Sequence, residues 1–174
     1  MPRFSAYNIR TMPDRSAYVY LTNKGVLIVV SQVKTTDGLS RIAPPITVLP
    51  TQEPLTLGQA VLAALAASGK VIPHPTDWAE DSRQSKLVFA PLFKAAKVTS
   101  WTGVQRHCAL ISIRESAGEF FITVWERSSG QSYAPSDIGS RQLPDRSPLS
   151  IGAEIIQAFI ACNERESSDE TFPE

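Results

Sequence analysis

The chain has 174 residues, of which 43% are hydrophobic, and this is enough for one globular domain with a sizeable core. Basic and acidic residues balance at 17 each, no apolar run approaches the roughly 18 residues that span a bilayer, and two cysteines are too few for a disulfide framework. The first residues also lack the apolar stretch of a secretory signal. We therefore expect a cytoplasmic protein with two buried, reduced thiols that binds neither nucleic acid nor membrane.

The first part of the chain predicts a β-hairpin followed by a helix. Residues 17–22 and 26–33 are rich in β-forming residues and flank the turn sequence Asn-Lys-Gly at 23–25. The second run begins VLIVV and is apolar on both faces, which favours a central, covered strand. A loop is expected at 35–45 and an amphipathic helix at 56–68.

The second part predicts another hairpin and another helix. Residues 84–97 have helical character but contain Pro91, so an interrupted helix is expected there. The later segments are, in chain order, a strand, a β-hairpin, a polar turn-rich loop and a helix, at residues 98–101, 108–127, 128–147 and 149–163. Antiparallel hairpins with helices on one face predict an α+β fold, a mainly antiparallel sheet in a two-layer single domain over residues 1–165. Residues 166–174 are expected to form a flexible acidic tail.

One helical segment occurs twice, as LTLGQAVLAALAAS at 55–68 and as LSIGAEIIQAFIAC at 149–162. The hydroxyl residue after each leading leucine is expected to be the N-cap. Gly58 and Gly152 occupy the same place in the two segments, although glycine in a helix costs roughly 1 kcal/mol relative to alanine. We therefore expect both glycines to face a neighbouring backbone at close range, most simply that of the sheet.

Common catalytic and cofactor-binding patterns are missing from the sequence. It contains no CxxC, HxxxH, HExxH, GxGxxG, GxSxG or phosphate-loop motif. His107 and Cys108 are adjacent on an expected strand, so their side chains point to opposite faces and cannot form a dyad. We expect no catalytic residue, no cofactor and no metal. A small hydrolase or nuclease with a scattered site, using His74 and His107, is the alternative.

The sequence PTDWAED at 75–81 is the candidate binding loop. It combines the acids Asp77, Glu80 and Asp81 with Trp78. Aromatic residues are common interface anchors, and clustered carboxylates favour a cationic partner. These four residues are the predicted partner-binding residues; a capped helix start with the tryptophan packed inward is the structural alternative.

From about residue 50 to 165 the chain is similar to the immunity proteins of bacterial contact-dependent growth inhibition (CDI) systems. The shared pattern is Leu-x-Leu-Gly opening the first helix, a tryptophan before the central strands, and Ile-Gly with Ala-Phe-x-x-Cys in the last helix. Here these stand in LTLGQAVLAALAAS, KAAKVTSW, HCALISI, FFITVW and LSIGAEIIQAFIAC.

The resemblance implies a protein that binds the C-terminal nuclease domain of a cognate toxin in the cytoplasm, as a monomer and one to one. It would protect the producing cell by occluding the toxin's active site. A secretion chaperone or adaptor, whose two similar helices bind a partner, is the other alternative.

Overall fold

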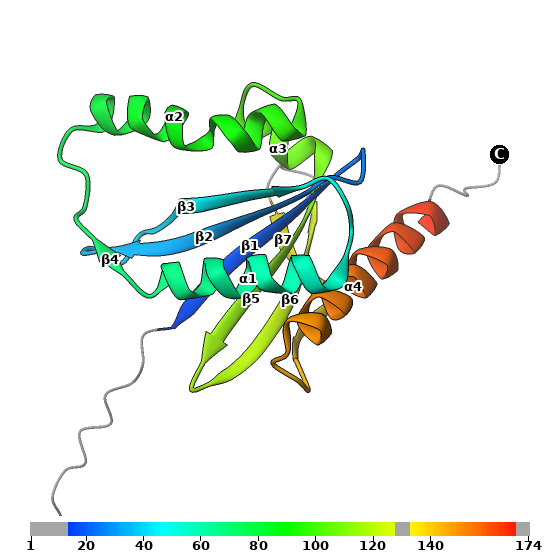
Figure 1. Cartoon of the computed structure of the whole chain (residues 1–174). Coiled ribbons are helices and arrows are strands. Elements are labelled where there is room, and N and C mark those ends of the chain that lie inside the picture. Colours follow the sequence, from blue (N-terminus) through cyan, green and yellow to red (C-terminus); the bar gives the residue numbers. More distant parts are fainter. Residues whose placement is uncertain (1–13, 128–132, 170–174) are drawn as a thin grey trace, which may run out of the picture.

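The structure is a computed structural model that describes residues 14–127 and 133–169. It is an open sheet with helices packed on it (Figure 1), which confirms the expected α+β class. The strands are β1 (Arg15–Thr22), β2 (Leu27–Thr35), β3 (Ser40–Leu49), β4 (Val71–Ile72), β5 (Cys108–Ser116), β6 (Glu119–Arg127) and β7 (Tyr133–Gln142). The helices are α1 (Pro54–Ser68), α2 (Trp78–Ala96), α3 (Trp101–His107) and α4 (Pro148–Asp169).

The strand order is β3-β2-β1-β5-β6-β7, and all these neighbours are antiparallel; the short β4 adds a parallel pairing to β2. The hairpin turn at 23–25 lies where the sequence predicts it, with Gly25 at φ 78°, a backbone conformation that suits glycine. The strand predicted at 26–33 is β2, and it lies between β1 and β3 with Leu27 and Ile28 fully buried on opposite faces. The prediction of a central, covered strand is confirmed for this part of β2.

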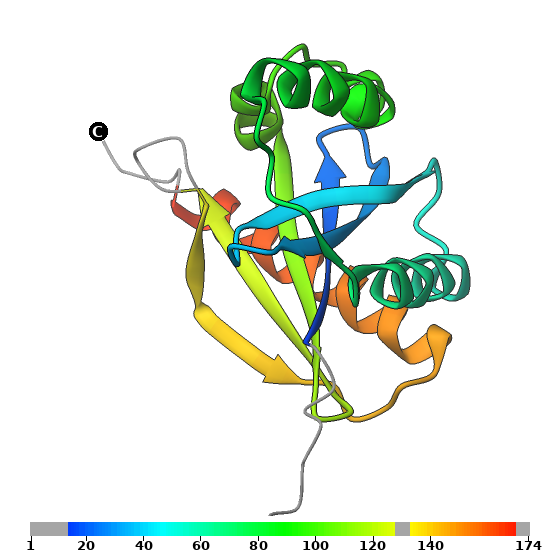
Figure 2. The ribbon, with the colours of Figure 1, turned by 90° about the vertical axis from the view of Figure 1, so that its left-hand side faces the viewer.

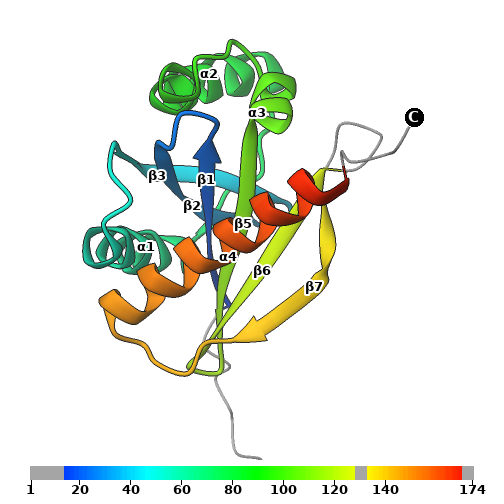
Figure 3. The ribbon, with the colours of Figure 1, turned by 90° about the vertical axis from the view of Figure 1, so that its right-hand side faces the viewer.

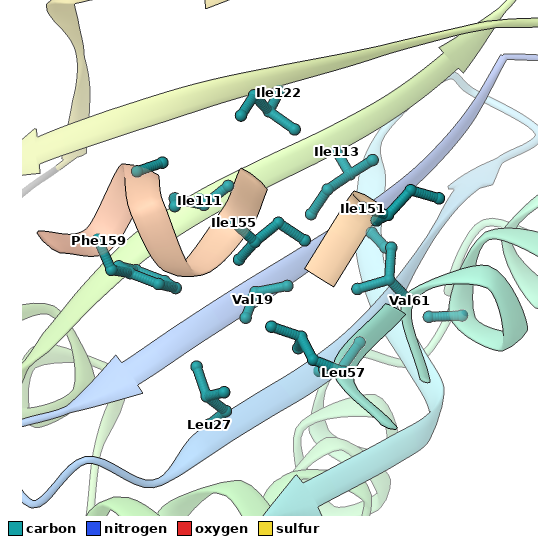
Figure 4. Close-up of a cluster of buried hydrophobic side chains, with 14 of the residues drawn as sticks. Val19, Leu27, Leu57, Val61, Ile111, Ile113, Ile122, Ile151, Ile155 and Phe159 are labelled. Carbon is teal, nitrogen blue, oxygen red and sulfur yellow. The ribbon is translucent and has the colours of Figure 1, made fainter. Parts of the chain in front are cut away.

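The main hydrophobic core lies between one face of the sheet and the pair α1 and α4. Figure 3 shows α4 crossing β5 and β6 with α1 beside it. In Figure 4 the labelled side chains of α1 and α4 meet those of the central strands. Examples without solvent exposure are Leu57 of α1, Ile155 of α4 and Val19 of β1. The two repeated helices therefore pack on the sheet, as predicted.

Gly58 and Gly152 do face a neighbouring backbone at close range, which confirms that prediction. A Cβ added to Gly58 would lie 1.7 Å from the carbonyl oxygen of Pro148, and one added to Gly152 would lie 1.8 Å from that of Pro54. The neighbouring backbone belongs to the other repeated helix, whereas we expected the sheet. The repeat thus begins one residue earlier, as PLTLG and PLSIG. In each copy the glycine packs against the backbone of the proline that begins the other copy.

The expected N-caps at Thr56 and Ser150 are wrong, because each helix begins with the proline two residues earlier. Proline fits the first turn, where its missing N–H has no helical partner to lose. Glu53 caps α1 and accepts hydrogen bonds from the N–H groups of Leu55 and Thr56 at 3.0 and 2.6 Å. At α4, the Ser147 hydroxyl accepts from the N–H of Ser150 at 3.3 Å.

Helix α2 runs through Pro91 without interruption, so the expected break in 84–97 is wrong. The proline removes the N–H that would donate to the carbonyl of Leu87. Both residues are exposed, with Leu87 at 69%, so water can reach that carbonyl. The strand expected at 98–101 is also wrong, because Ser100 caps the short helix α3 there and accepts from the N–H of Gly103 at 3.2 Å.

Two strands lie in segments that the sequence predicts as loops. Residues 40–45 belong to β3, and residues 133–142 of the expected loop at 128–147 form β7. Both are edge strands of the sheet. Edge strands tolerate proline and polar residues, and Pro44 and Pro45 lie in β3 and Pro135 in β7, so the apolar alternation that marks an inner strand is missing.

At the C-terminal end, α4 extends to Asp169, four residues into the segment predicted as a tail; residues 170–174 lie outside the described part. Within the described residues, no helix combines the length and the apolar character required to cross a bilayer.

Ser31 of β2 gives the first test of the core. It is fully buried, and within the described residues its hydroxyl has no hydrogen-bond partner. A buried polar group without a partner costs about 1–3 kcal/mol, so Ser31→Ala is expected to raise the free energy of unfolding by roughly 1 kcal/mol in urea titrations. Ser68→Ala is the matched control, since that buried hydroxyl donates to the Leu65 carbonyl and accepts from the N–H of Ser16. It should destabilise; a loss of stability in both variants would contradict the prediction.

Candidate functional site: the open half of the sheet

Helices α2 and α3 cover only one end of the second face of the sheet. Figure 2 shows them together at that end, away from α1 and α4. Leu92 of α2 and Val104 of α3 are fully buried there against Tyr20, Ile28 and Leu110, which lie side by side on β1, β2 and β5. Burial raises the pKa of Tyr20 well above its ordinary value, helped by nearby Tyr133, Tyr18 and Cys108, so its hydroxyl stays protonated and neutral.

The next two rows of side chains on the same face are mostly polar, with Val30 of β2 in the first and Phe121 of β6 in the second as the apolar members. Two residues along each strand, Thr123, Ser112 and Tyr18 are cross-strand neighbours on β6, β5 and β1. One row further, the neighbours on β6, β5, β1 and β2 are Phe121, Arg114, Ser16 and Gln32. A shallow groove lies here, lined by Asp14, Ser16, Tyr18, Gln32, Lys34, Ser112, Ile113, Arg114 and Trp125. We call this lining, together with Phe121 and Thr123, the open sheet face.

Hydrogen bonds between strands hold the floor of this groove in one arrangement. The Ser16 hydroxyl donates to Gln32 Oε1 at 2.7 Å, and Gln32 Nε2 donates to the Tyr18 hydroxyl at 2.7 Å. On the other side, the Trp125 ring N–H donates to the Ser112 hydroxyl at 2.8 Å. The open sheet face is therefore a pre-ordered surface of polar groups and three aromatic rings, a type of surface that binds without first having to be organised.

Two cations and one carboxylate belong to the open sheet face. Arg114 lies over the ring of Phe121, with the guanidinium carbon 5.7 Å from the ring centre. Lys34 and Asp14 complete the charged groups of the groove. In the described part of the chain none of the three takes part in an ion pair. The groove thus carries a small positive excess that nothing in the described structure neutralises.

The sequence analysis missed this surface, although a pattern in the central strands indicates it. On β2, the side chains facing this side change from Ile28 and Val30 to Gln32 and Lys34. A strand buried along its whole length would stay apolar at these alternate positions. The change from apolar to polar at every second residue falls between Leu110 and Ser112 on β5 and one row later, between Val30 and Gln32, on β2, and it marks where the covering helices end.

The predicted binding residues at 75–81 are engaged mostly within the protein. Asp77 caps α2 and accepts from the N–H groups of Ala79 and Glu80 at 2.9 and 3.0 Å. Asp81 binds Arg41 through two hydrogen bonds of 2.6 and 2.7 Å, and Glu80 forms an ion pair with Arg83 of the same helix. The acids therefore form a capped helix start rather than an unneutralised patch.

Trp78 does not pack inward, since its side chain is 59% exposed. Its ring meets that of His74 edge to face, with 5.4 Å between the ring centres. It remains available to a partner, and its role in binding stays a prediction.

The two histidines lie at opposite ends of the sheet. His74 approaches the end of β2, where its backbone N–H donates to the Thr36 hydroxyl at 3.1 Å. His107 precedes Cys108, which pairs with Thr22 near the start of β2. The length of β2 separates them by roughly 25 Å, so they cannot act as acid and base on one bond. Cys108 is buried and Cys162 half-buried.

The chain is similar to known proteins in its fold. No family model matches the sequence, and no curated protein matches it. Among solved structures, a chain of the CdiA-CT/CdiI toxin and immunity complex from Yersinia pseudotuberculosis is similar, with a TM-score of 0.64 and 15% identity over 86% of this chain and 97% of that chain. A protein of unknown function from Neisseria meningitidis is similar with a TM-score of 0.60 and 20% identity, over 90% and 97%. At these identities, the chain shares its fold with a chain of a toxin–immunity complex.

Proposed function

We propose that this protein is an immunity protein of a contact-dependent growth inhibition system, which binds and neutralises the C-terminal nuclease domain of its cognate toxin in the cytoplasm. The observation that carries the proposal is the likeness of its fold to a chain of the CdiA-CT/CdiI complex, which extends over 97% of that chain. The repeated helices and central strands that resemble such immunity proteins in sequence are the elements that build this fold.

The surface of the described structure suits a binding protein. The open sheet face holds a groove, combines polar with aromatic side chains and is ordered by hydrogen bonds between strands. Neutralisation has to be tight, because a few unbound nuclease molecules can kill a cell, and nanomolar affinity corresponds to about 12 kcal/mol. An interface of standard size can reach that affinity when it includes buried aromatic anchors and complementary charges. The exposed Trp78 and the aromatic residues of the open sheet face are the available anchors.

Co-expression with the neighbouring toxin tests the proposal. The proposal predicts that a large surface protein with a toxic C-terminal domain is encoded beside this gene. That domain is expressed from an inducible promoter, with and without this protein. We expect growth arrest without it, growth in its presence, and one-to-one co-elution of the two chains in size-exclusion chromatography.

A toxin domain of unrelated sequence is the control and should still arrest growth. Continued arrest by the neighbouring toxin, with this protein soluble and at equal or higher level, would overturn the proposal.

A further inference from the structure

The hydrogen-bonding groups of the open sheet face are unequally used, and apart from the Asp14 carboxylate the unused side-chain groups are mainly donors. The Tyr18 hydroxyl accepts from Gln32, and the Ser112 hydroxyl accepts from Trp125. Each hydroxyl also carries one hydrogen that it can donate. Within the described residues neither hydrogen has an acceptor, so both remain available to a ligand in the groove.

The acceptors of the same surface are largely occupied. Gln32 Oε1 receives the Ser16 hydroxyl, while the second N–H of the Gln32 amide is left over. Arg114 and Lys34 add donors only, and Asp14 is the one carboxylate that lines the groove. The groove therefore complements a ligand that is rich in acceptors and carries negative charge.

The number and placement of the charges favour a carboxylate over a nucleic-acid backbone. A nucleic acid is held by several cations along a continuous positive track, commonly against 6–10 phosphates. The described groove has two cations, Lys34 and Arg114, which are too few to form such a track. Two cations that flank a donor-rich floor suit one or two carboxylates, each of which can accept several hydrogen bonds.

The width of the groove suits an extended peptide. Gln32 and Arg114 lie on β2 and β5, on either side of β1, and strands are spaced by about 4.8 Å, so their backbones are about 10 Å apart. Tyr18 and Trp125 supply aromatic surface between and beside these groups, against which the stem of an acidic side chain or a neighbouring apolar residue can pack.

We propose that the open sheet face binds an acidic segment of the toxin domain, with toxin Asp or Glu carboxylates accepting hydrogen bonds from Tyr18, Arg114 and Lys34. This inference rests on the proposed function and names the chemistry of its contact. The contact is charge-assisted and lies on the rigid strands β1, β2 and β5, so it sets how the toxin is oriented on the immunity protein.

Two substitutions test the contact in the intact protein. Tyr18→Phe keeps the ring but removes the hydroxyl, and with it both the free donor and the acceptor of Gln32 Nε2; it should weaken binding of the purified toxin domain by about tenfold or more. Arg114→Glu reverses one charge of the groove and should weaken binding by about a hundredfold or more. Dissociation constants are measured by biolayer interferometry at low and physiological salt, with circular dichroism as the check on folding.

The chain offers a matched control for the charge reversal. Arg146 lies over the ring of Phe120, with its guanidinium carbon 5.9 Å from the ring centre, and Phe120 belongs to the opposite face of the sheet. Arg146→Glu thus makes the same change of charge at the same kind of ring contact outside the groove. It should leave the affinity within about twofold of the unaltered protein.

The outcomes of these measurements distinguish failure of the proposed contact from failure of the proposed function. If the unaltered protein binds and both groove variants bind equally well, the inference is overturned while the proposed function stands. A second outcome would also overturn the inference: the unaltered protein binds a single-stranded oligonucleotide at micromolar concentration and Arg114→Glu does not. The groove would then be a site for phosphate groups and not for carboxylates. If the unaltered protein does not bind the toxin domain, the proposed function is wrong, and the inference that rests on it is wrong as well.

Discussion

Gly58→Ala is expected to lower the free energy of unfolding by roughly 1–3 kcal/mol. The new Cβ would lie 1.7 Å from the carbonyl oxygen of Pro148, far inside the distance that two atoms tolerate. That oxygen belongs to the first turn of α4 and cannot rotate away as a side chain would. The two helices must therefore separate, and the separation loosens the buried residues between them, such as Leu57 and Ile151. Urea unfolding of the purified variant measures the change.

A control in the same helix isolates the contact from helix propensity. By propensity alone, Gly58→Ala would stabilise the protein by about 1 kcal/mol. Ala63→Gly, at an exposed position of α1, should lose about that amount. The two opposite exchanges are thus both expected to destabilise. A gain in stability for Gly58→Ala would show that the two helices do not meet at this residue.

The reciprocal contact also predicts that the two glycines are coupled. Gly152→Ala should cost about as much as Gly58→Ala, since its Cβ would lie 1.8 Å from the Pro54 carbonyl oxygen. Once one substitution has pushed the first turns of α1 and α4 apart, the Cβ of the second substitution already has part of the space that it needs. The double variant should therefore lose less stability than the sum of the two single variants, by an amount in the range of about 0.5–3 kcal/mol for contacting sites.

The sequence predicts those parts of the fold where one physical preference dominates. Apolar periodicity identifies α1 and α4, and a turn sequence between β-forming runs identifies the hairpin of β1 and β2. The predictions fail where tertiary contacts decide. β3 and β7 are held by one neighbouring strand each and carry proline or polar residues, so their sequences resemble loops. Helix α2 tolerates Pro91 because the affected carbonyl faces solvent, which local propensity does not reveal.

The candidate site could be predicted less well than the fold. The acids at 77–81 form a cluster in the sequence, but their partners are distant or local residues such as Arg41 and Arg83, which only the folded chain brings to them. The open sheet face is assembled from single residues of separate strands, so no short motif marks it. The sequence pattern that indicates the open sheet face is the change from apolar to polar side chains at alternate positions of β2 and β5. That change becomes interpretable once the strand register is known.

Helix α2, which borders the open sheet face, is expected to have the lowest local stability of the helices and strands in the domain. Leu92 and Ala96 are the only buried residues in the 19 residues of α2. The N-terminal half is attached by Asp81, which binds Arg41 of β3, and by the hydrogen bond from Arg41 to the Ser85 hydroxyl. An element with so few buried apolar contacts can open while the rest of the protein stays folded.

Leu92→Ala is therefore expected to cost about 2–5 kcal/mol of local stability, because Leu92 is fully buried and the cavity would remove its contacts with the apolar residues under α2 and α3, such as Tyr20 and Ile28. Hydrogen exchange resolved by segment measures the effect. Protection should fall across Trp78–Ala96 and remain in β1, β2 and β5, which the main hydrophobic core on the other face supports independently. Leu87→Ala in the same helix is the control, since its side chain is 69% exposed and its loss should change stability by less than about 0.5 kcal/mol. Equal exchange in the two variants, or a uniform rise in exchange across the whole sheet in Leu92→Ala, would show that Leu92 is not the main contact that holds α2.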